Sequence, residues 1–171
     1  MPDNETENLS NIDLMLELKP AERQKVEESC SFKRYDEQEQ IIDRQSETTD
    51  VFFIIHGTVR VVNYSLSGRE ITLDDLTEGN YFGELAALDG APRSASVMAL
   101  TDCLLAALPR EHFLALLENH SSISLKVMKS LAGIVRTSTD RIMDLSTLAA
   151  NNRVQAGLLR LARNHVDDGN R

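Results

Sequence analysis

The spacing of hydrophobic residues divides the chain into segments of different structure. Between Ile12 and Cys30 the apolar positions have the spacing of short helices, and Pro20 suits the first turn of the second one. After Cys30 come short apolar or alternating runs, separated by turns that contain Gly, Asn, Asp and Pro. Strands of this length, with turns about every eight to twelve residues, predict an antiparallel barrel or sandwich. The predicted strands lie in IIDRQ, DVFFII, TVRVV, EITLDDL, SASVMAL and CLLAAL.

Helices are predicted again after the strands. Pro109 ends the β-rich region, and the following REHFLALLEN has the pattern of a short helix. From Ser121 to about Ala149 there is no proline, and a stripe of positions recurs at steps of three and four, as in a coiled coil. The stripe could pack on the β-rich part of its own chain, but because it is sustained and narrow we favour dimerisation through residues 121–149. Its members are Met128, Leu131, Val135, Ser138, Ile142, Leu145 and Ala149.

The two ends of the chain lie outside the predicted strands and the long helix. The first ten residues are polar and acidic, which predicts a loose tail. Asn151-Asn152 suits a hinge or a cap, and RVQAGLLRLARN then begins another helix for which the sequence supplies no packing partner.

Composition narrows the classes of partner. The chain has 18 Lys and Arg against 27 Asp and Glu, a formal net charge of −9, so it lacks the basic surface with which a protein grips DNA or an anionic membrane. Cys30 and Cys103 lie far apart, and we expect both to remain reduced as small buried hydrophobes. With no membrane-length apolar run and no leader at the start, we expect a soluble, cytoplasmic protein without membrane contact.

Residues 82–97, FGELAALDGAPRSASV, hold the candidate chemistry. A cyclic phosphate diester joined to a ribose needs a guanidinium with fork geometry, which Arg93 provides. A ribose 2′-hydroxyl needs an anionic acceptor, and Glu84 supplies one. The small residues Gly83, Ala86 and Ala87 would let main-chain amides approach the phosphate. A glutamate and an arginine around such a loop are, taken alone, more often solvated surface residues.

The whole string, however, resembles the phosphate-binding cassette of cyclic nucleotide-binding domains, FGE-[LI]-[AG]-x-[LI], a gap, then PR-[AST]-A-[ST]-V. The resemblance extends from about Ile12 to Ala162 and implies an α+β fold: an antiparallel β-roll, similar to a jelly roll or double-stranded β-helix, with N-terminal helices and a long C-terminal dimerisation helix. Two turns that commonly carry glycine hold Gln38 and Ser46 here, and we expect them to be less tight. The conforming residues are Phe82, Gly83, Glu84, Leu85, Ala86, Leu88, Pro92, Arg93, Ser94, Ala95, Ser96 and Val97.

The resemblance also implies roles for several of these residues. Arg93 would hold the cyclic phosphate and Glu84 the ribose 2′-hydroxyl. The amides near Leu85 and Ala86 and that of Ala95, together with the Ser94 hydroxyl, would complete the phosphate cradle. The apolar wall around ribose and base would be formed by Val61 and Leu73.

Among branches of the family, the chain looks most like the bacterial Crp/Fnr regulators. Kinase regulatory subunits carry two cassettes and channel tails follow a membrane domain, whereas here there is one cassette, a long helix and a hinge. DNA binding would need a C-terminal domain that is absent from this sequence, and the alternative is a stand-alone domain that acts on a protein partner. We expect four parts: 1–28, tail and short helices; 29–120, cyclic nucleotide-binding β-roll; 121–150, dimerisation helix; 151–171, hinge and first helix of the absent DNA-binding domain.

The expected ligand is cAMP. By resemblance to the catabolite activator, Ser138 and Thr139 would contact the adenine amino group from both subunits, although mid-helix hydroxyls also commonly bond their own helix carbonyls. Ser94 leaves cGMP open, because the residue after the cassette arginine is often threonine in cGMP-dependent kinases.

Other classes fit less well. Two cysteines cannot supply the four thiolates of an iron–sulfur cluster, and the histidines show no ligand spacing for haem. Sensors of other small molecules in this fold usually lose the Glu/Arg cassette. A cyclic nucleotide hydrolase would need metal ligands or an activated nucleophile, and no HxxH, HExxH or Asp/His cluster occurs. We therefore expect neither an enzyme nor a metal site.

Overall fold

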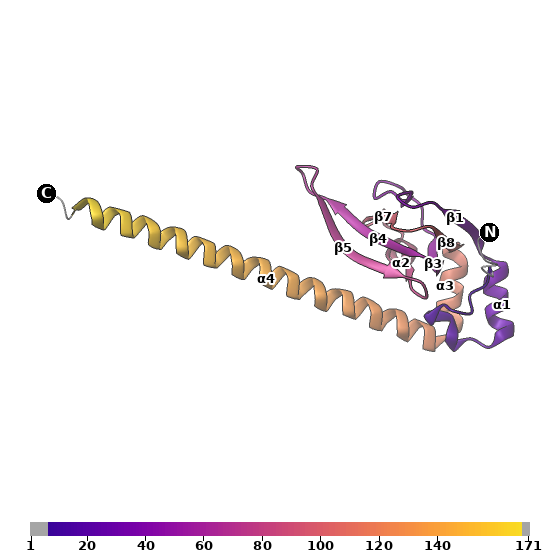
Figure 1. The fold of residues 1–171 in the computed structure, drawn as a ribbon. Helices are drawn as coiled ribbons and strands as arrows, with labels where there is room; N and C mark the ends of the chain where they lie inside the picture. The colour runs from indigo at the N-terminus through magenta and orange to yellow at the C-terminus, as the bar shows by residue number, and fades with distance from the viewer. Residues whose placement is uncertain (1–6, 169–171) are drawn as a thin grey trace. The chain divides into compact units, whose positions relative to one another are not determined.

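The structure of the chain is a computed structural model that describes the backbone of residues 7–168 and the side chains of residues 7–143 and Ser146. The chain divides into two compact units, Met1–Lys126 and Val127–Arg171. In the first unit a 3-10 helix and a short α-helix precede eight strands, among which one short helix is inserted (Figure 1). The helices are η1 (Asp13–Glu17), α1 (Pro20–Glu28), α2 (Glu84–Asp89), α3 (Arg110–Asn119) and α4 (Ser121–Asp168). The strands are β1 (Ser31–Tyr35), β2 (Gln40–Ile42), β3 (Val51–His56), β4 (Thr58–Tyr64), β5 (Glu70–Thr77), β6 (Tyr81–Phe82), β7 (Ser96–Ala99) and β8 (Cys103–Leu108).

The strands form two antiparallel sheets whose order interleaves the two ends of the β-rich region. One sheet has the order β1-β8-β3-β6 and the other β2-β7-β4-β5. The late strands β8 and β7 thus lie between early strands, β8 between β1 and β3 and β7 between β2 and β4. This pairing is that of a roll, and it confirms the predicted α+β fold with an antiparallel β-roll and a long C-terminal helix.

A hydrophobic core cluster draws residues from both sheets. Phe52 and Ile54 of β3 belong to it together with Val59 of β4 and Val97 of β7. The intervening residues of β3 are buried too, so this strand is covered on both faces and reads as a continuous apolar run. The loop directly before β3 contains Thr48 and Asp50.

The N-terminal segment differs from the predicted loose tail. Leu9 is fully buried, and its backbone N–H donates a hydrogen bond to Glu27 Oε1 at 2.9 Å. A single leucine among polar residues gives no sequence period, which is why its burial was missed. The predicted short helices are confirmed as η1 and α1, and Pro20 begins α1.

The two turns expected to be less tight are closed ones. Gln38 adopts the left-handed conformation that glycine would take there, with φ 68°, and the Glu39 N–H closes the turn by donating to Asp36 O at 3.0 Å. Ser46 donates both its N–H and its hydroxyl to Asp43 O, at 2.9 and 2.8 Å. Hydrogen bonds therefore hold both turns closed although neither position is a glycine.

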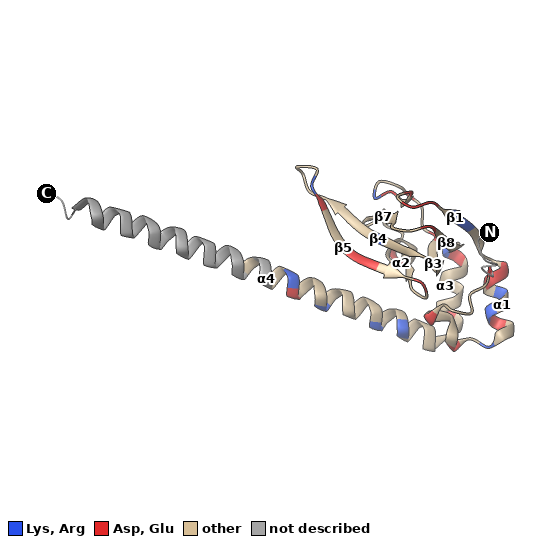
Figure 2. Cartoon of the chain, viewed as in Figure 1, with Lys and Arg blue, Asp and Glu red and all other residues tan. Residues whose placement is uncertain are grey.

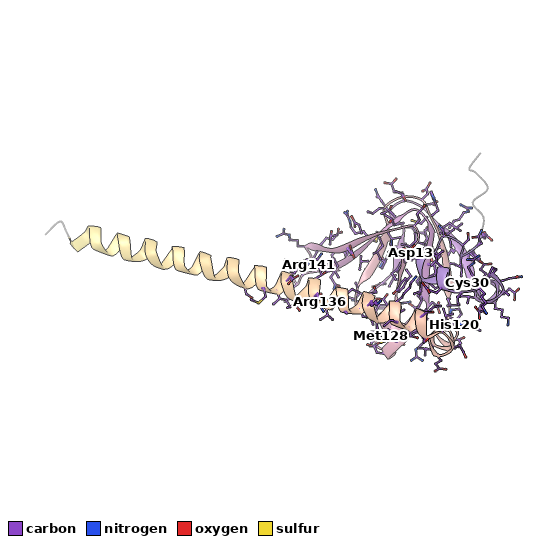
Figure 3. The ribbon with its side chains drawn as sticks, turned by 90° about the horizontal axis from the view of Figure 1, so that it is seen from below. Asp13, Cys30, His120, Met128, Arg136 and Arg141 are labelled. Carbon is purple, nitrogen blue, oxygen red and sulfur yellow. The ribbon has the colours of Figure 1, made fainter. Side chains whose placement is uncertain are left out.

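Helix α4 is continuous over Ser121–Asp168. Its backbone stays helical through Asn151-Asn152, so no break occurs at the predicted hinge, and the boundary between the predicted parts 121–150 and 151–171 remains a prediction. Met128, Arg136 and Arg141 follow one another along it (Figure 3). Among the described residues, no helix combines the length and the apolar character that crossing a membrane requires.

The stripe predicted on α4 is largely exposed within one chain. The exposed fractions are 57% for Met128, 64% for Val135 and 62% for Ile142. Leu131 is half-buried and Ser138 is exposed, while the side chains of Leu145 and Ala149 lie outside the described residues. Exposed residues of this size at coiled-coil spacing are available to a partner surface.

Candidate ligand-binding site

The cassette begins with a tight junction between β6 and α2. Gly83 follows Phe82 in the left-handed region, with φ 87°, and caps the six-residue helix α2, while Gly90 ends that helix with φ 71°. The Gly90 N–H donates to Ala86 O at 3.0 Å, and the Ala91 N–H donates to Asp89 Oδ1 at 2.9 Å. Glycine at both ends thus lets the chain enter and leave one short helical turn within a few residues.

At Gly83 the absence of a side chain is also a matter of space. A Cβ atom there would lie 2.6 Å from Arg93 Nη1 and 2.9 Å from Asp50 O, both far inside contact distance. The backbone of the β6–α2 junction therefore lies too close to the guanidinium to leave room for a side chain at position 83. Glycine at this position is required by the arginine as well as by the turn.

Arg93 is buried, with only 4% of its surface exposed. Its Nη1 donates to Gly83 O at 3.0 Å, its Nη2 to Asp50 O at 2.8 Å and its Nε to Thr48 Oγ1 at 3.1 Å. The guanidinium carbon lies 5.8 Å from the centre of the Phe52 ring, which stacks on Phe82. Three of the five N–H groups of the arginine are thus used, and one remains on each Nη nitrogen.

The two charged side chains of the cassette are both desolvated. Burial lowers the pKa of Arg93, and the negative charges of Asp50 and Glu84 oppose that shift. Burial raises the pKa of Glu84, partly offset by a hydrogen bond to its own backbone and by the charge of Arg93. Each charge would therefore gain from a partner of opposite character: an anion for the guanidinium and a hydrogen-bond donor for the carboxylate.

The other cassette residues surround this pair. Phe82, Ala86 and Ala95 are buried, whereas Ser94 is exposed and Leu85 has 38% of its surface exposed. The structure therefore brings together all of the predicted residues between 82 and 95 around one loop. Their roles toward a ligand remain predictions.

Val61 and Leu73, the predicted apolar wall, meet at an irregularity between β4 and β5. Val61 pairs with Asp74 and the next residue, Val62, pairs with Thr72, so Leu73 is the extra residue of a β-bulge. Val61 also pairs with Val97 of β7, the last residue of the cassette. The two wall residues are thus adjacent to each other, and Val61 packs against the core cluster.

Ser138 and Thr139 lie on α4 in the second unit, and both are exposed. The Thr139 hydroxyl donates to Val135 O at 2.9 Å, one turn back along the helix. This bond is the alternative considered from the sequence for a mid-helix hydroxyl. Contact of these residues with a ligand remains a prediction.

Sequence reasoning missed the residues that hold the arginine and the loop. Thr48 and Asp50 bond Arg93 from a segment more than forty positions earlier, and Asn63 Nδ2 of β4 donates to Ser94 O at 3.2 Å. Two of the acceptors, Gly83 O and Asp50 O, are backbone carbonyls, which leave no residue signature in a sequence. The position of Asp50 directly before the buried VFFII run was the one available hint.

Both cysteines are free thiols, and Cys103 Sγ donates to Thr101 O at 3.2 Å. Cys103 is buried, and burial raises the pKa of Cys30 to about 12, with the charge of Glu27 adding to the shift. In the part of the chain that the structure describes, no group of three or more His, Cys, Asp and Glu residues could hold a metal ion. The expectation that the protein works without a metal stays a prediction.

The roll buries an arginine beside a glycine-bounded loop, an arrangement whose chemistry suits a small anion. Comparison with known families gives the particular class: the family described as "Cyclic nucleotide-binding domain" matches residues 32–120. The chain belongs to this cyclic nucleotide-binding domain family. The match covers the β-roll, the cassette and α3.

Known relatives include regulators of two kinds. The chain is 26% identical over 135 residues to the cAMP-activated global transcriptional regulator CRP of Salmonella typhimurium, an alignment that covers 78% of this chain and 64% of the regulator. The crystal structure of the Thermus thermophilus catabolite activator protein matches with a TM-score of 0.70 and 30% identity, covering 78% of this chain and 62% of that one. The regulatory subunit of a cAMP-independent protein kinase A from Trypanosoma brucei matches with a TM-score of 0.61 and 27% identity, covering 71% and 43%. The chain thus spans less than two thirds of each of these proteins, and all three are regulatory proteins rather than enzymes.

The close approach at Gly83 predicts the effect of adding one methyl group. Gly83→Ala forces a Cβ into Arg93 Nη1 and Asp50 O, whereas Gly68→Ala, at a φ of 77° with nothing within 4 Å, imposes backbone strain alone. We expect Gly68→Ala to cost about 1 kcal/mol of unfolding free energy and Gly83→Ala roughly 2 kcal/mol more. Chemical denaturation of both variants measures the difference, and equal losses would contradict the account of the buried guanidinium.

The raised pKa of Glu84 predicts a pH-dependent gain from Glu84→Gln. Between the ordinary value of 4.5 and the raised pKa, the folded chain holds a proton that the unfolded chain has lost, so this group reduces stability as pH rises. The stability advantage of Glu84→Gln over the wild type should therefore be near zero at about pH 4.5 and grow toward neutral pH. Thermal unfolding across this range tests the sign. An advantage that shrinks as pH rises would mean that Arg93, and not burial, dominates at Glu84.

Proposed function

We propose that the chain is the cAMP-binding effector part of a Crp/Fnr-type transcription regulator. The observation that carries the proposal is the buried Arg93 guanidinium, which keeps an N–H on each Nη nitrogen after bonding Gly83 O, Asp50 O and Thr48 Oγ1. A buried cation that still has donors to offer is suited to a cyclic phosphate. The ligand and the DNA-binding activity of the relatives are carried to this chain as parts of the proposal.

The nucleotide supplies what the two desolvated charges need. Its phosphate brings a single negative charge to Arg93 in a site of low dielectric, where a charge-assisted hydrogen bond is strong. Its ribose 2′-hydroxyl donates to the Glu84 carboxylate. The amides of Leu85, Ala86 and Ala95 and the Ser94 hydroxyl add donors around the phosphate, and Val61 with Leu73 covers the sugar and base.

Helix α4 would carry the signal. Its exposed stripe, Met128, Val135 and Ile142, supports a homodimer through residues 121–149, in which Ser138 and Thr139 reach the base from the two subunits. Occupancy of the site then shifts the helix pair between two arrangements, with a coupling free energy of about 1–3 kcal/mol. DNA contact would come only from a further C-terminal domain, and the protein would act in the cytoplasm.

Two alternatives keep the same fold. The chain could act as a regulatory domain, for cAMP or cGMP, on a protein partner, which the likeness to a kinase regulatory subunit favours. It could instead sense another small molecule, because that kinase is described as cAMP-independent. A binding measurement with both nucleotides separates the second alternative from the proposal.

Titration calorimetry with cAMP tests the site assignment. We expect Arg93→Ala to weaken binding at least about a hundredfold, because a buried charge pair loses one partner. Arg93→Lys, which keeps the charge but loses the fork, should fall between Arg93→Ala and the wild type. The control is Arg69→Ala, an exposed arginine in the β4–β5 turn, which should bind as the wild type does. Wild-type affinity in a folded Arg93→Ala would refute the assignment.

Sedimentation equilibrium tests the dimer. Val135→Asp puts a charge into the proposed seam and should raise the dimer dissociation constant about tenfold or more. Thr137→Asp adds the same charge two positions on, on the other side of the helix, and should leave the dimer intact. A wild-type chain that stays monomeric with and without cAMP, or equal weakening by the two variants, would count against a helix seam.

A further inference from the structure

Register places a carboxylate on the inner face of the β4–β5 pair. Residues that pair across antiparallel strands project to the same side, and successive residues alternate. Val59 pairs with Leu76, and both belong to or pack against the core cluster, so they define the inner face. Val61 lies two residues on from Val59, and its partner is Asp74. Asp74 therefore projects from the inner face.

The next residue along β5 shows the opposite orientation. Asp75 pairs with Arg60, which alternates with Val59 and Val61. Arg60 donates to both Asp75 oxygens, from Nε and from Nη2, each at 2.7 Å, and this ion pair is exposed. Asp74 and Asp75 belong to the red part of β5 in Figure 2. Asp75 forms an ion pair on the outer face of the strand pair, whereas Asp74 projects from the inner face.

The inner face at this point leads to the cassette. Asn63, two residues beyond Val61 on the same face, donates from Nδ2 to Ser94 O, next to Arg93. Asp74 consequently lies between the apolar core end of the strand pair and its cassette end. It adjoins both Val61 and the bulge residue Leu73.

The Asp74 carboxylate has bonding capacity to spare. It is exposed, and its Oδ1 accepts the Asp75 N–H at 3.0 Å, which fixes the side chain. A carboxylate has about four acceptor positions on its two oxygens, and one N–H occupies one of them. The position of this carboxylate suits a ligand group other than the phosphate, since the carboxylates whose charges act on Arg93 are Asp50 and Glu84.

We propose that Asp74 is a specificity-determining residue that reads the base of a bound cyclic nucleotide and favours guanine relative to adenine. A carboxylate only accepts hydrogen bonds, and the guanine edge offers N1–H and N2–H donors side by side. Adenine presents one donor, N6–H, beside the acceptor N1, which a carboxylate repels and a carboxamide matches. The inference rests on the proposed nucleotide site and bears on the choice between cAMP and cGMP left open there, because Asp74 shifts that choice toward cGMP.

The test is a comparison of affinity ratios. Calorimetric titrations with cAMP and with cGMP are run on the wild type, Asp74→Asn and Asp75→Asn, each checked by thermal unfolding. Asp74→Asn exchanges an acceptor for a donor without a change of shape, and we expect it to raise the preference for cAMP over cGMP about tenfold. Asp75→Asn removes the neighbouring charge on the outer face and should leave the ratio unchanged.

The other possible results of the titrations would overturn either the proposed function or the role of Asp74. A wild type that binds neither nucleotide refutes the proposed function itself. If the wild type binds but the ratio moves equally in both variants, general charge explains the change and Asp74 does not read the base. A ratio unchanged in Asp74→Asn, or equal weakening of both nucleotides, likewise overturns the inference.

Discussion

The burial of one guanidinium constrains the whole cassette. A cation removed from water must have its N–H groups satisfied, and Arg93 finds Gly83 O, Asp50 O and Thr48 Oγ1 within 3.1 Å. These acceptors come from the β6–α2 junction and from the loop before β3, which must therefore lie together. The pairing of Phe52 with Phe82 between β3 and β6 holds them there. Gly83 has no side chain because the arginine and the Asp50 carbonyl occupy its place.

The same burial disfavours the charged forms of Arg93 and Glu84. Desolvation shifts the pKa of Arg93 down and that of Glu84 up, both against the charged form, although each charge partly supports the other. Proteins commonly accept such a loss of stability where function needs a preorganised charge. A bound cyclic nucleotide would compensate both groups at once, through its phosphate and its 2′-hydroxyl, so binding and stability are coupled at this loop.

Local patterns predicted much of this molecule, and long-range contacts account for what they missed. The cassette residues, the six apolar strands β2, β3, β4, β5, β7 and β8, and α3 follow from local composition, and the structure has them. Strand β1 was missed because SFKRY is mostly polar, and β6 because it has only two residues. The burial of Leu9 and the backbone acceptors of Arg93 depend on partners far away in the sequence. Asn151-Asn152 suggested a break, but neither residue prevents a helix, and α4 runs through them.

Asp74 and Asp75 illustrate why residue type alone cannot assign a function here. They are chemically identical neighbours in a polar strand, and from the sequence either could be a solvated surface charge. The pleat sends them to opposite faces, and the bulge at Leu73 fixes which face each one takes. Asp75 is satisfied by Arg60, whose hydrogen bonds lower its pKa. Asp74 accepts the Asp75 N–H on Oδ1 and faces the side where Asn63 reaches the cassette. A shift of one residue in the register would exchange their roles, so any choice of base at this site depends on that bulge.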